Sequence, residues 1–282
     1  MSLDAGQFLT KLQSELSGGE LEIAGFPDSC LRLLRELRDV FVSTATLARL
    51  VKADPALSLR VIAMANSAAY QSSSGPISDA AGAISRIGLA ALRTVVLAHA
   101  FATLRDQKAY KFVQNRMGEI WSRSLAMAVV ARAIASRLAS RGIDREALVL
   151  GGMLSGVGKI YLLAEMAHHE KVLEDFAAVE HLLETWHAKA TRRLLEQWEF
   201  PESTVRAATG WEKARSADGE DSMADILYVS SLLVDLRDNR EELVRRLPIS
   251  APAMRLGLAS TEPDELYAAA DSEAASIKGA LA

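Results

Sequence analysis

Apolar residues recur at helical spacing along most of this chain, and that periodicity limits the possible folds more than any other feature. One predicted helix face is formed by Cys30, Leu33, Leu34, Leu37 and Phe41. Positions three and four residues apart share a face of an α-helix, whereas a half-buried strand alternates apolar and polar residues. No segment shows that alternation, and no repeat of fixed period indicates a solenoid. The sequence therefore predicts an all-α fold.

Residues that begin and end helices divide this pattern into separate elements. Ser43 is a favourable N-cap, and Asp54-Pro55 combines an N-cap with proline at the first helical position. A helix that begins after Ser78 or Asp79 is expected to end at Gly88, because glycine is favoured just past a helix end. Further helices are expected at about residues 120–140, 145–154, 157–166, 187–198 and 222–236, with one more opening at Pro201.

Changes of composition suggest where the chain divides. An apolar first part ends near Gln107–Lys111. We therefore expect one helical lobe over about residues 1–106 and a second over about residues 107–282. The segment Arg215–Asp221 is polar and contains glycine, which makes it a candidate linker within the second lobe.

The overall charge argues against broad electrostatic binding to nucleic acid or to a membrane. The 282 residues carry a net charge of -4 and half are hydrophobic, and the pI is near 5.8. This balance does not exclude a local basic patch. The N-terminus lacks a signal-peptide pattern, and we expect no run of the roughly 18 apolar residues that span a membrane, so a cytoplasmic location is predicted. The single cysteine, Cys30, excludes an internal disulfide and is expected in the core.

Three sequence blocks follow one another in the first half of the chain. Gly25-Phe26-Pro27 comes first, and the block KADPALSLRVIAMANSAAY (Lys52–Tyr70) comes second. The third is AISRIGLAALR (Ala83–Arg93). It is improbable that all three blocks occur together by chance in this order and at this spacing.

The second half carries three more blocks, which are WSRS (Trp121–Ser124), GMLSGVGK (Gly152–Lys159) and HAKATRRLLEQWEFP (His187–Pro201). Taken with the first half, the chain resembles the HDOD domain over about residues 22–235. HDOD domains are non-catalytic bacterial relatives of the HD phosphohydrolase superfamily. The resemblance implies a two-lobed helical fold whose second lobe is an HD-like bundle.

Catalytic HD relatives hold divalent metals with His and Asp residues from several helices. The resemblance places Arg123 at the first ligand position, Ser155-Gly156 at the His-Asp pair and Ser231 at the terminal Asp. It places Trp211-Glu212 where HD-GYP relatives have a His-His pair, and only His187 keeps a ligand type. A guanidinium has no lone pair to donate, and one imidazole does not make a catalytic metal site. The sequence therefore predicts no catalytic residue, no metal ligand and no cofactor.

The resemblance implies a non-enzymatic regulatory module in bacterial signalling that binds other proteins in trans, such as proteins of cyclic-dinucleotide or two-component pathways. Two alternatives stay open. The emptied HD pocket could bind a small anionic ligand or nucleotide through Arg123, Lys159 and His187. Thr44–Asn66 could be a DNA-binding helix-turn-helix, although nucleic acid is the less favoured partner. The cations that would contact the DNA phosphates in this segment are few: Arg49, Lys52 and Arg60.

Overall fold

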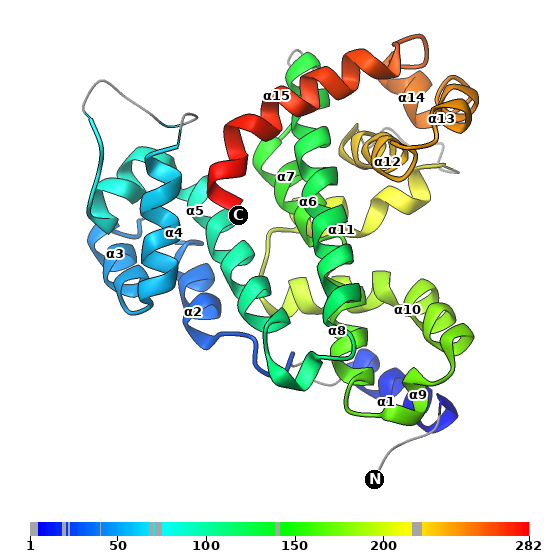
Figure 1. The fold of residues 1–282 in the computed structure, drawn as a ribbon, viewed down its shortest axis with the longest axis horizontal. Helices are drawn as coiled ribbons and strands as arrows, with labels where there is room; N and C mark the ends of the chain where they lie inside the picture. The colour runs from blue at the N-terminus through cyan, green and yellow to red at the C-terminus, as the bar shows by residue number, and fades with distance from the viewer. Residues whose placement is uncertain are drawn as a thin grey trace. The chain divides into compact units, whose positions relative to one another are not determined.

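The computed structural model describes residues 5–18, 21, 23–39, 41–67, 70, 75–138, 142–215 and 222–281. Within these ranges the chain forms helices and no strand, so the predicted all-α fold is confirmed (Figure 1). Most of the predicted linker, residues 216–221, lies outside the described residues.

The α-helices are α1 (Ala5–Gly18), α2 (Asp28–Glu36), α3 (Thr44–Lys52), α4 (Pro55–Ala65), α5 (Ala80–Arg105), α6 (Gln114–Arg137), α7 (Arg145–Leu154), α8 (Val157–Met166), α9 (Glu170–Leu173), α10 (Phe176–Gln197), α11 (Glu202–Gly210), α12 (Ser222–Asp235), α13 (Arg240–Arg246), α14 (Ala251–Leu256) and α15 (Pro263–Leu281). Two 3-10 helices are η1 (Lys108–Tyr110) and η3 (Trp211–Arg215).

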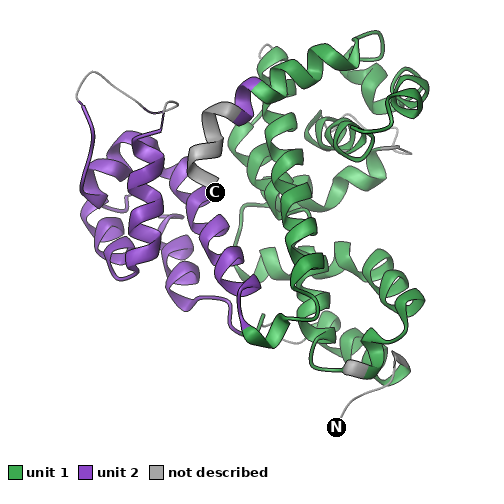
Figure 2. Ribbon diagram, viewed as in Figure 1, with its two compact units in different colours: residues 1–24, 108–271 green, residues 25–107, 272–282 purple. Residues whose placement is uncertain are grey.

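The chain forms two compact units (Figure 2). Unit 1 contains residues 1–24 and 108–271, and unit 2 contains residues 25–107 and 272–282. The lobes expected from the sequence divide the chain once, near residue 106. In the structure α1 belongs to unit 1, where it contacts α9 and α10. Lys11 Nζ lies 2.8 Å from Glu165 Oε2, a pair separated by 154 positions in the chain, and local sequence patterns carry no information on such a contact.

Capping residues fix where the helices of unit 2 begin. The Ser43 hydroxyl accepts a hydrogen bond of 3.1 Å from the Thr46 N–H at the start of α3. Asp54 Oδ1 accepts hydrogen bonds of 3.0 and 3.1 Å from two amides in the first turn of α4. Gly88 has φ 79° inside α5, a conformation that favours glycine, and the helix kinks there. The predicted caps and the predicted break at Gly88 are confirmed.

The apolar stripe predicted for the first helix of unit 2 does not reach Phe41. Helix α2 ends at Glu36, and the chain continues through a turn in which the Arg38 N–H donates to the Arg35 carbonyl at 3.1 Å. Phe41 is 90% exposed as a result, so its predicted place on the buried face is wrong. Cys30 is buried as predicted, and this burial raises the pKa of its thiol to about 11.

Asp54 joins two elements of unit 2, because its second oxygen, Oδ2, lies 2.8 Å from His99 Nε2 on α5. Burial acts to raise the pKa of Asp54, but hydrogen bonds from the Leu57 amide and from His99 outweigh it, so the pKa lies below its ordinary value. We expect Asp54→Ala to lower the free energy of unfolding by about 2 kcal/mol, because it removes both the cap and the histidine contact. Urea unfolding followed by circular dichroism measures this loss. Asp54→Asn is the matched control because it keeps a capping oxygen, and an equal loss in both variants would contradict the cap's contribution.

The core of unit 1 contains α6, α7, α8, α10, α11 and α12, which pack against one another. The bounds predicted for α7 and α8 match the structure, and α12 ends one residue earlier than predicted. Helix α10 starts at Phe176, well before the predicted residue 187, because Asp175 caps it by accepting a hydrogen bond of 3.0 Å from the Ala178 amide. Helix α6 likewise starts earlier than predicted, at Gln114.

Two segments are long and apolar enough to cross a membrane, by length and composition alone: Ala80–Arg105 and Arg145–Met166. The expectation that the chain has no such run is therefore wrong. In the structure, 67% and 89% of their apolar windows are buried, as in core helices of soluble proteins. The cytoplasmic location itself stays a prediction.

Candidate functional site

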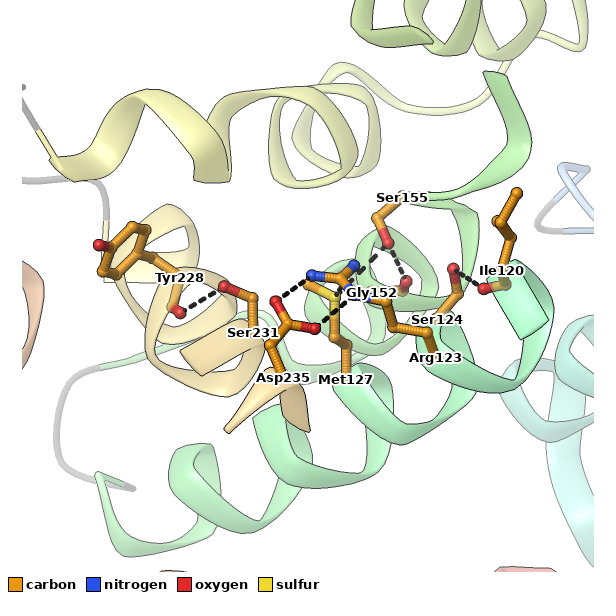
Figure 3. Close-up of polar contacts among 9 residues, drawn as sticks. All are labelled: Ile120, Arg123, Ser124, Met127, Gly152, Ser155, Tyr228, Ser231 and Asp235. Atoms are coloured by element: carbon orange, nitrogen blue, oxygen red, sulfur yellow. Dashed lines mark hydrogen bonds and ion pairs between the residues drawn. The ribbon is translucent and has the colours of Figure 1, made fainter. Parts of the chain in front are cut away.

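Arg123 is the residue that the HD resemblance places at the first ligand position, and it makes several polar contacts. Its Nε and Nη2 atoms donate to the two carboxylate oxygens of Asp235, at 2.6 and 2.7 Å (Figure 3). The same guanidinium lies 5.5 Å from the ring centre of Trp211 and donates from Nη1 to the sulfur of Met127 at 3.1 Å. These contacts connect α6, α12 and η3 through one cation. A fork of two parallel hydrogen bonds is the strongest geometry for an arginine–carboxylate pair.

Ser155 and Gly156 form the junction between α7 and α8, as Figure 3 shows for Ser155. The Ser155 hydroxyl donates to the Gly152 carbonyl at 2.7 Å and lies 3.9 Å from the sulfur of Met127. At Gly156, an added Cβ would lie 2.6 Å from both Ile120 Cγ2 and Ser124 Oγ. Real Cβ atoms essentially never show such short contacts, so a carboxylate side chain at position 156 has no space unless α6 side chains move.

His187 is the ligand-type residue that the sequence retains, and it is 5% exposed on α10. Its Nε2 lies 3.2 Å from Glu212 Oε1 in η3. Its Nδ1 is buried and has no hydrogen-bond partner among the described residues. Burial acts to raise the pKa of Glu212, but the hydrogen bond to His187 and the charges of Lys159 and Arg123 outweigh it, and the pKa lies below its ordinary value.

Lys159 lies in the first turn of α8, next to the same charges. Burial lowers the pKa of its ammonium group, and the charge of Arg123 lowers it further. Three carboxylates act in the opposite direction, those of Glu212, Glu184 and Glu180. The site therefore contains cations that are matched by nearby carboxylates, rather than a free positive pocket.

Ser231 was assigned to the terminal Asp position, but it is not the residue that completes this site. Its hydroxyl donates to the Tyr228 carbonyl at 2.8 Å within α12 and is buried (Figure 3). Asp235, one helical turn further on, reaches Arg123 instead. The sequence analysis missed Asp235, and the signal that could have found it is its i+4 position from Ser231, which places both on one helix face.

These residues do not fit a divalent metal ion. The structure brings together Arg123, Trp211, His187, Glu212 and Lys159, but only His187 and Glu212 offer ligand atoms that are not already held by the Arg123 guanidinium. A catalytic zinc site needs three protein ligands. Among the residues that the structure describes, no group of three or more His, Cys, Asp and Glu side chains is placed to hold a metal.

Comparison with known families identifies the fold that carries this site. The family model of the HDOD domain matches residues 23–213, more than half of the chain and nearly all of the positions discussed above. The chain belongs to the HDOD domain family. Among curated proteins, no relative matches this HDOD protein.

Solved structures resemble the HDOD protein in fold. One is from Shewanella amazonensis SB2B, provisionally called a metal-dependent phosphohydrolase, with a TM-score of 0.71 and 21% identity over 95% of this chain and 98% of that chain. Another, an HDOD domain protein with unknown function from Geobacter sulfurreducens, has a TM-score of 0.62 and 22% identity over 99% of this chain and 98% of that chain. A third, from Marinobacter aquaeolei VT8 and provisionally called a signal transduction protein, has a TM-score of 0.54 and 17% identity over 96% of this chain and 66% of that chain. At these identities the likeness establishes the fold alone.

Proposed function

We propose that this HDOD protein is a non-enzymatic regulatory module that acts by binding other proteins in trans. The observation that carries the proposal is the ion pair between Arg123 and Asp235, which two hydrogen bonds join. By the HD resemblance, Arg123 takes the first metal-ligand position of catalytic relatives, so a cation of the protein would stand where they hold metal ions. A guanidinium repels a divalent ion and donates no lone pair to it.

The family and one structural relative also support a regulatory role. The HDOD domain is the family of this chain, and the Marinobacter aquaeolei relative carries a signal-transduction name. The Shewanella amazonensis relative carries a phosphohydrolase name, and that name belongs to that protein. Protein binding requires no metal centre.

A hydrolase assay tests the proposal. Purified protein with added Mn²⁺, Fe²⁺ or Zn²⁺ is expected to hydrolyse p-nitrophenyl phosphate and its diester no faster than buffer with the same metal. Metal-dependent turnover that His187→Ala abolishes would overturn the proposal. Lys111→Ala is the matched control because this exposed cation of unit 1 is not part of the site, so turnover unchanged by both variants identifies a contaminating phosphatase.

Affinity purification from the native host, followed by mass spectrometry, tests whether the protein binds other proteins as proposed. We expect one or more signalling proteins to be retained by the full chain, and the purified partner to form a complex with it in size-exclusion chromatography. A partner that fails to rebind as a pure protein counts against the proposal.

One observation favours a second candidate, a small anionic ligand in the former metal site. The buried Nδ1 of His187 has no partner among the described residues, and an added ligand atom could supply one. Such a ligand has to compete with Asp235 for Arg123 and with Glu212 for His187. A panel of nucleotides that leaves the melting temperature unchanged would exclude this candidate. Duplex DNA binding, the third alternative, is excluded if no band shift occurs at low salt.

A further inference from the structure

Unit 1 contains a concave site, and none of the residues assigned to the HD ligand positions lines it. It is a groove of about 650 Å³ formed by α10, α11, η3 and the first turn of α12. A volume of this size lies in the usual range for small-molecule sites, about 300–1,000 Å³. The polar side chains that line this basic groove are Thr185, Lys189, Arg192, Arg206, Thr209, Lys213 and Asp225.

The basic groove and the former metal site use opposite faces of α10. Thr185, Ala188, Lys189 and Arg192 line the groove, at the i, i+3, i+4 and i+7 positions of one helix face. His187 is two residues from both Thr185 and Lys189, which places it about 200° around the helix from each. A ligand in the groove therefore meets a different set of side chains from one in the former metal site.

Cations outnumber acids among the side chains that line the groove, and the lining acid, Asp225, is already paired. Asp225 accepts hydrogen bonds of 2.8 and 2.5 Å from Arg255, which also donates to the Ala214 carbonyl at 2.8 Å. The four cations are Lys189, Arg192, Arg206 and Lys213. Arg255 therefore offsets the charge of Asp225, while Arg192 also lies near the carboxylates of Glu196 and Glu202.

Two of these cations are held in place by the protein. Arg192 lies 3.4 Å from one oxygen of Glu196 and 3.4 Å from one oxygen of Glu202, and its Nη2 donates to the Thr209 hydroxyl at 3.4 Å. These distances are long for hydrogen bonds, so Arg192 is oriented without being tightly bound. Lys189 lies 5.7 Å from the ring centre of Trp186.

Arg206 is the cation most available to a ligand. It is exposed on α11 and has no carboxylate partner among the residues that the structure describes. Its guanidinium can offer two parallel donors to a phosphate group, and the lysine ammonium groups act as point charges on the same ligand.

We propose that the basic groove binds a small ligand that carries two or more phosphate groups. Four cations line one cavity, and arginine forks match phosphate oxygens. The hydroxyl groups of Thr185 and Thr209 add hydrogen-bonding capacity at the same rim. Nucleic acid is the less suitable occupant, because it needs a long basic stripe and the chain as a whole carries a net charge of -4.

Isothermal titration calorimetry with sodium tripolyphosphate and, separately, with ATP tests the proposal on the full chain. Both probes are expected to bind at low salt and to weaken as salt rises, because the attraction is electrostatic. Arg206→Ala and Lys189→Ala are each expected to weaken tripolyphosphate binding by about tenfold, the effect of losing one charge-assisted contact. If ATP binds more tightly than tripolyphosphate, the groove recognises a nucleotide, and if the two bind equally, it recognises the phosphate chain alone.

The control variant is Lys111→Ala, which removes an exposed cation of unit 1 that does not line the groove. It is expected to leave the affinity unchanged. No measurable heat with either probe at low salt overturns the proposal, and so does a loss of affinity in Lys111→Ala equal to that in Arg206→Ala. Circular dichroism of each variant confirms that the helical fold is retained, and both groove residues are exposed, so their removal leaves the core intact.

Discussion

Replacing Gly158 with alanine is expected to lower the free energy of unfolding by about 3 kcal/mol, because the new methyl group has no space between α8 and α10. The added Cβ would lie 2.1 Å from the His187 carbonyl oxygen, and 2.6 and 2.7 Å from the Thr191 hydroxyl oxygen and amide nitrogen. The closest atom belongs to the backbone of α10, so no side-chain rotation relieves the clash. The two helices must move apart, and the hydrogen bond of 3.1 Å from the Gly158 N–H to the Thr191 hydroxyl is lost with that movement.

Urea unfolding of Gly158→Ala and of Gly210→Ala measures this effect against a matched control. Gly210 also lies in a helix, but an added Cβ there meets nothing within 4 Å. Alanine favours helices by about 1 kcal/mol over glycine, so Gly210→Ala is expected to be neutral or stabilising. If Gly158→Ala is as stable as the wild type, then α8 and α10 leave room for a methyl group at Gly158, which contradicts the close contact with His187 and Thr191.

The second large effect is expected from Arg255→Met, which leaves the carboxylate of Asp225 buried without its partner. Asp225 is 3% exposed, and Arg255 supplies two hydrogen bonds to it. Removing one member of a buried ion pair costs about 3–5 kcal/mol, and the partial exposure of Arg255 places the expected loss near the lower end. The same variant also removes the hydrogen bond from Arg255 to the Ala214 carbonyl, which connects α14 to η3.

A double variant separates the charge from the packing. Asp225→Asn combined with Arg255→Met removes both charges, and it is expected to recover much of the stability lost in Arg255→Met alone. Arg237→Ala is the exposed control, because Arg237 and Asp271 are 55% and 59% exposed, and its loss is expected to stay below about 1 kcal/mol. A loss in Arg237→Ala as large as in Arg255→Met would mean that burial does not control these pairs.

Local signals in the sequence predicted much of the helical framework. A cap such as Asp54 acts on amides two and three residues away, so the sequence alone contains the whole interaction. The bounds of α7 and α8 and the break at Gly88 were predicted for the same reason. The position of Phe41 was not, because a helical pattern continues in the sequence after the helix itself has ended at Glu36.

The candidate site was predicted less completely, because its contacts connect distant parts of the chain. The resemblance assigns residues that are unsuitable as ligands, including Arg123 and Gly156, to the HD metal positions. It could not show that Arg123 pairs with Asp235, since 112 positions separate them. It also could not show the charge of the basic groove, which depends on whether Arg255 reaches Asp225 across 30 positions.

The close packing around Gly156 has a consequence for the substitutions that this chain can accept at the α7–α8 junction. A carboxylate at position 156 conflicts with Ile120 and Ser124, so a substitution that restores one ligand would first destabilise the bundle. The neighbouring side chains would have to become smaller beforehand, and Arg123 would have to be replaced as well. Each of these steps brings no catalytic benefit by itself. A metal site at this junction would therefore require several substitutions together, because no single one supplies a complete set of ligands.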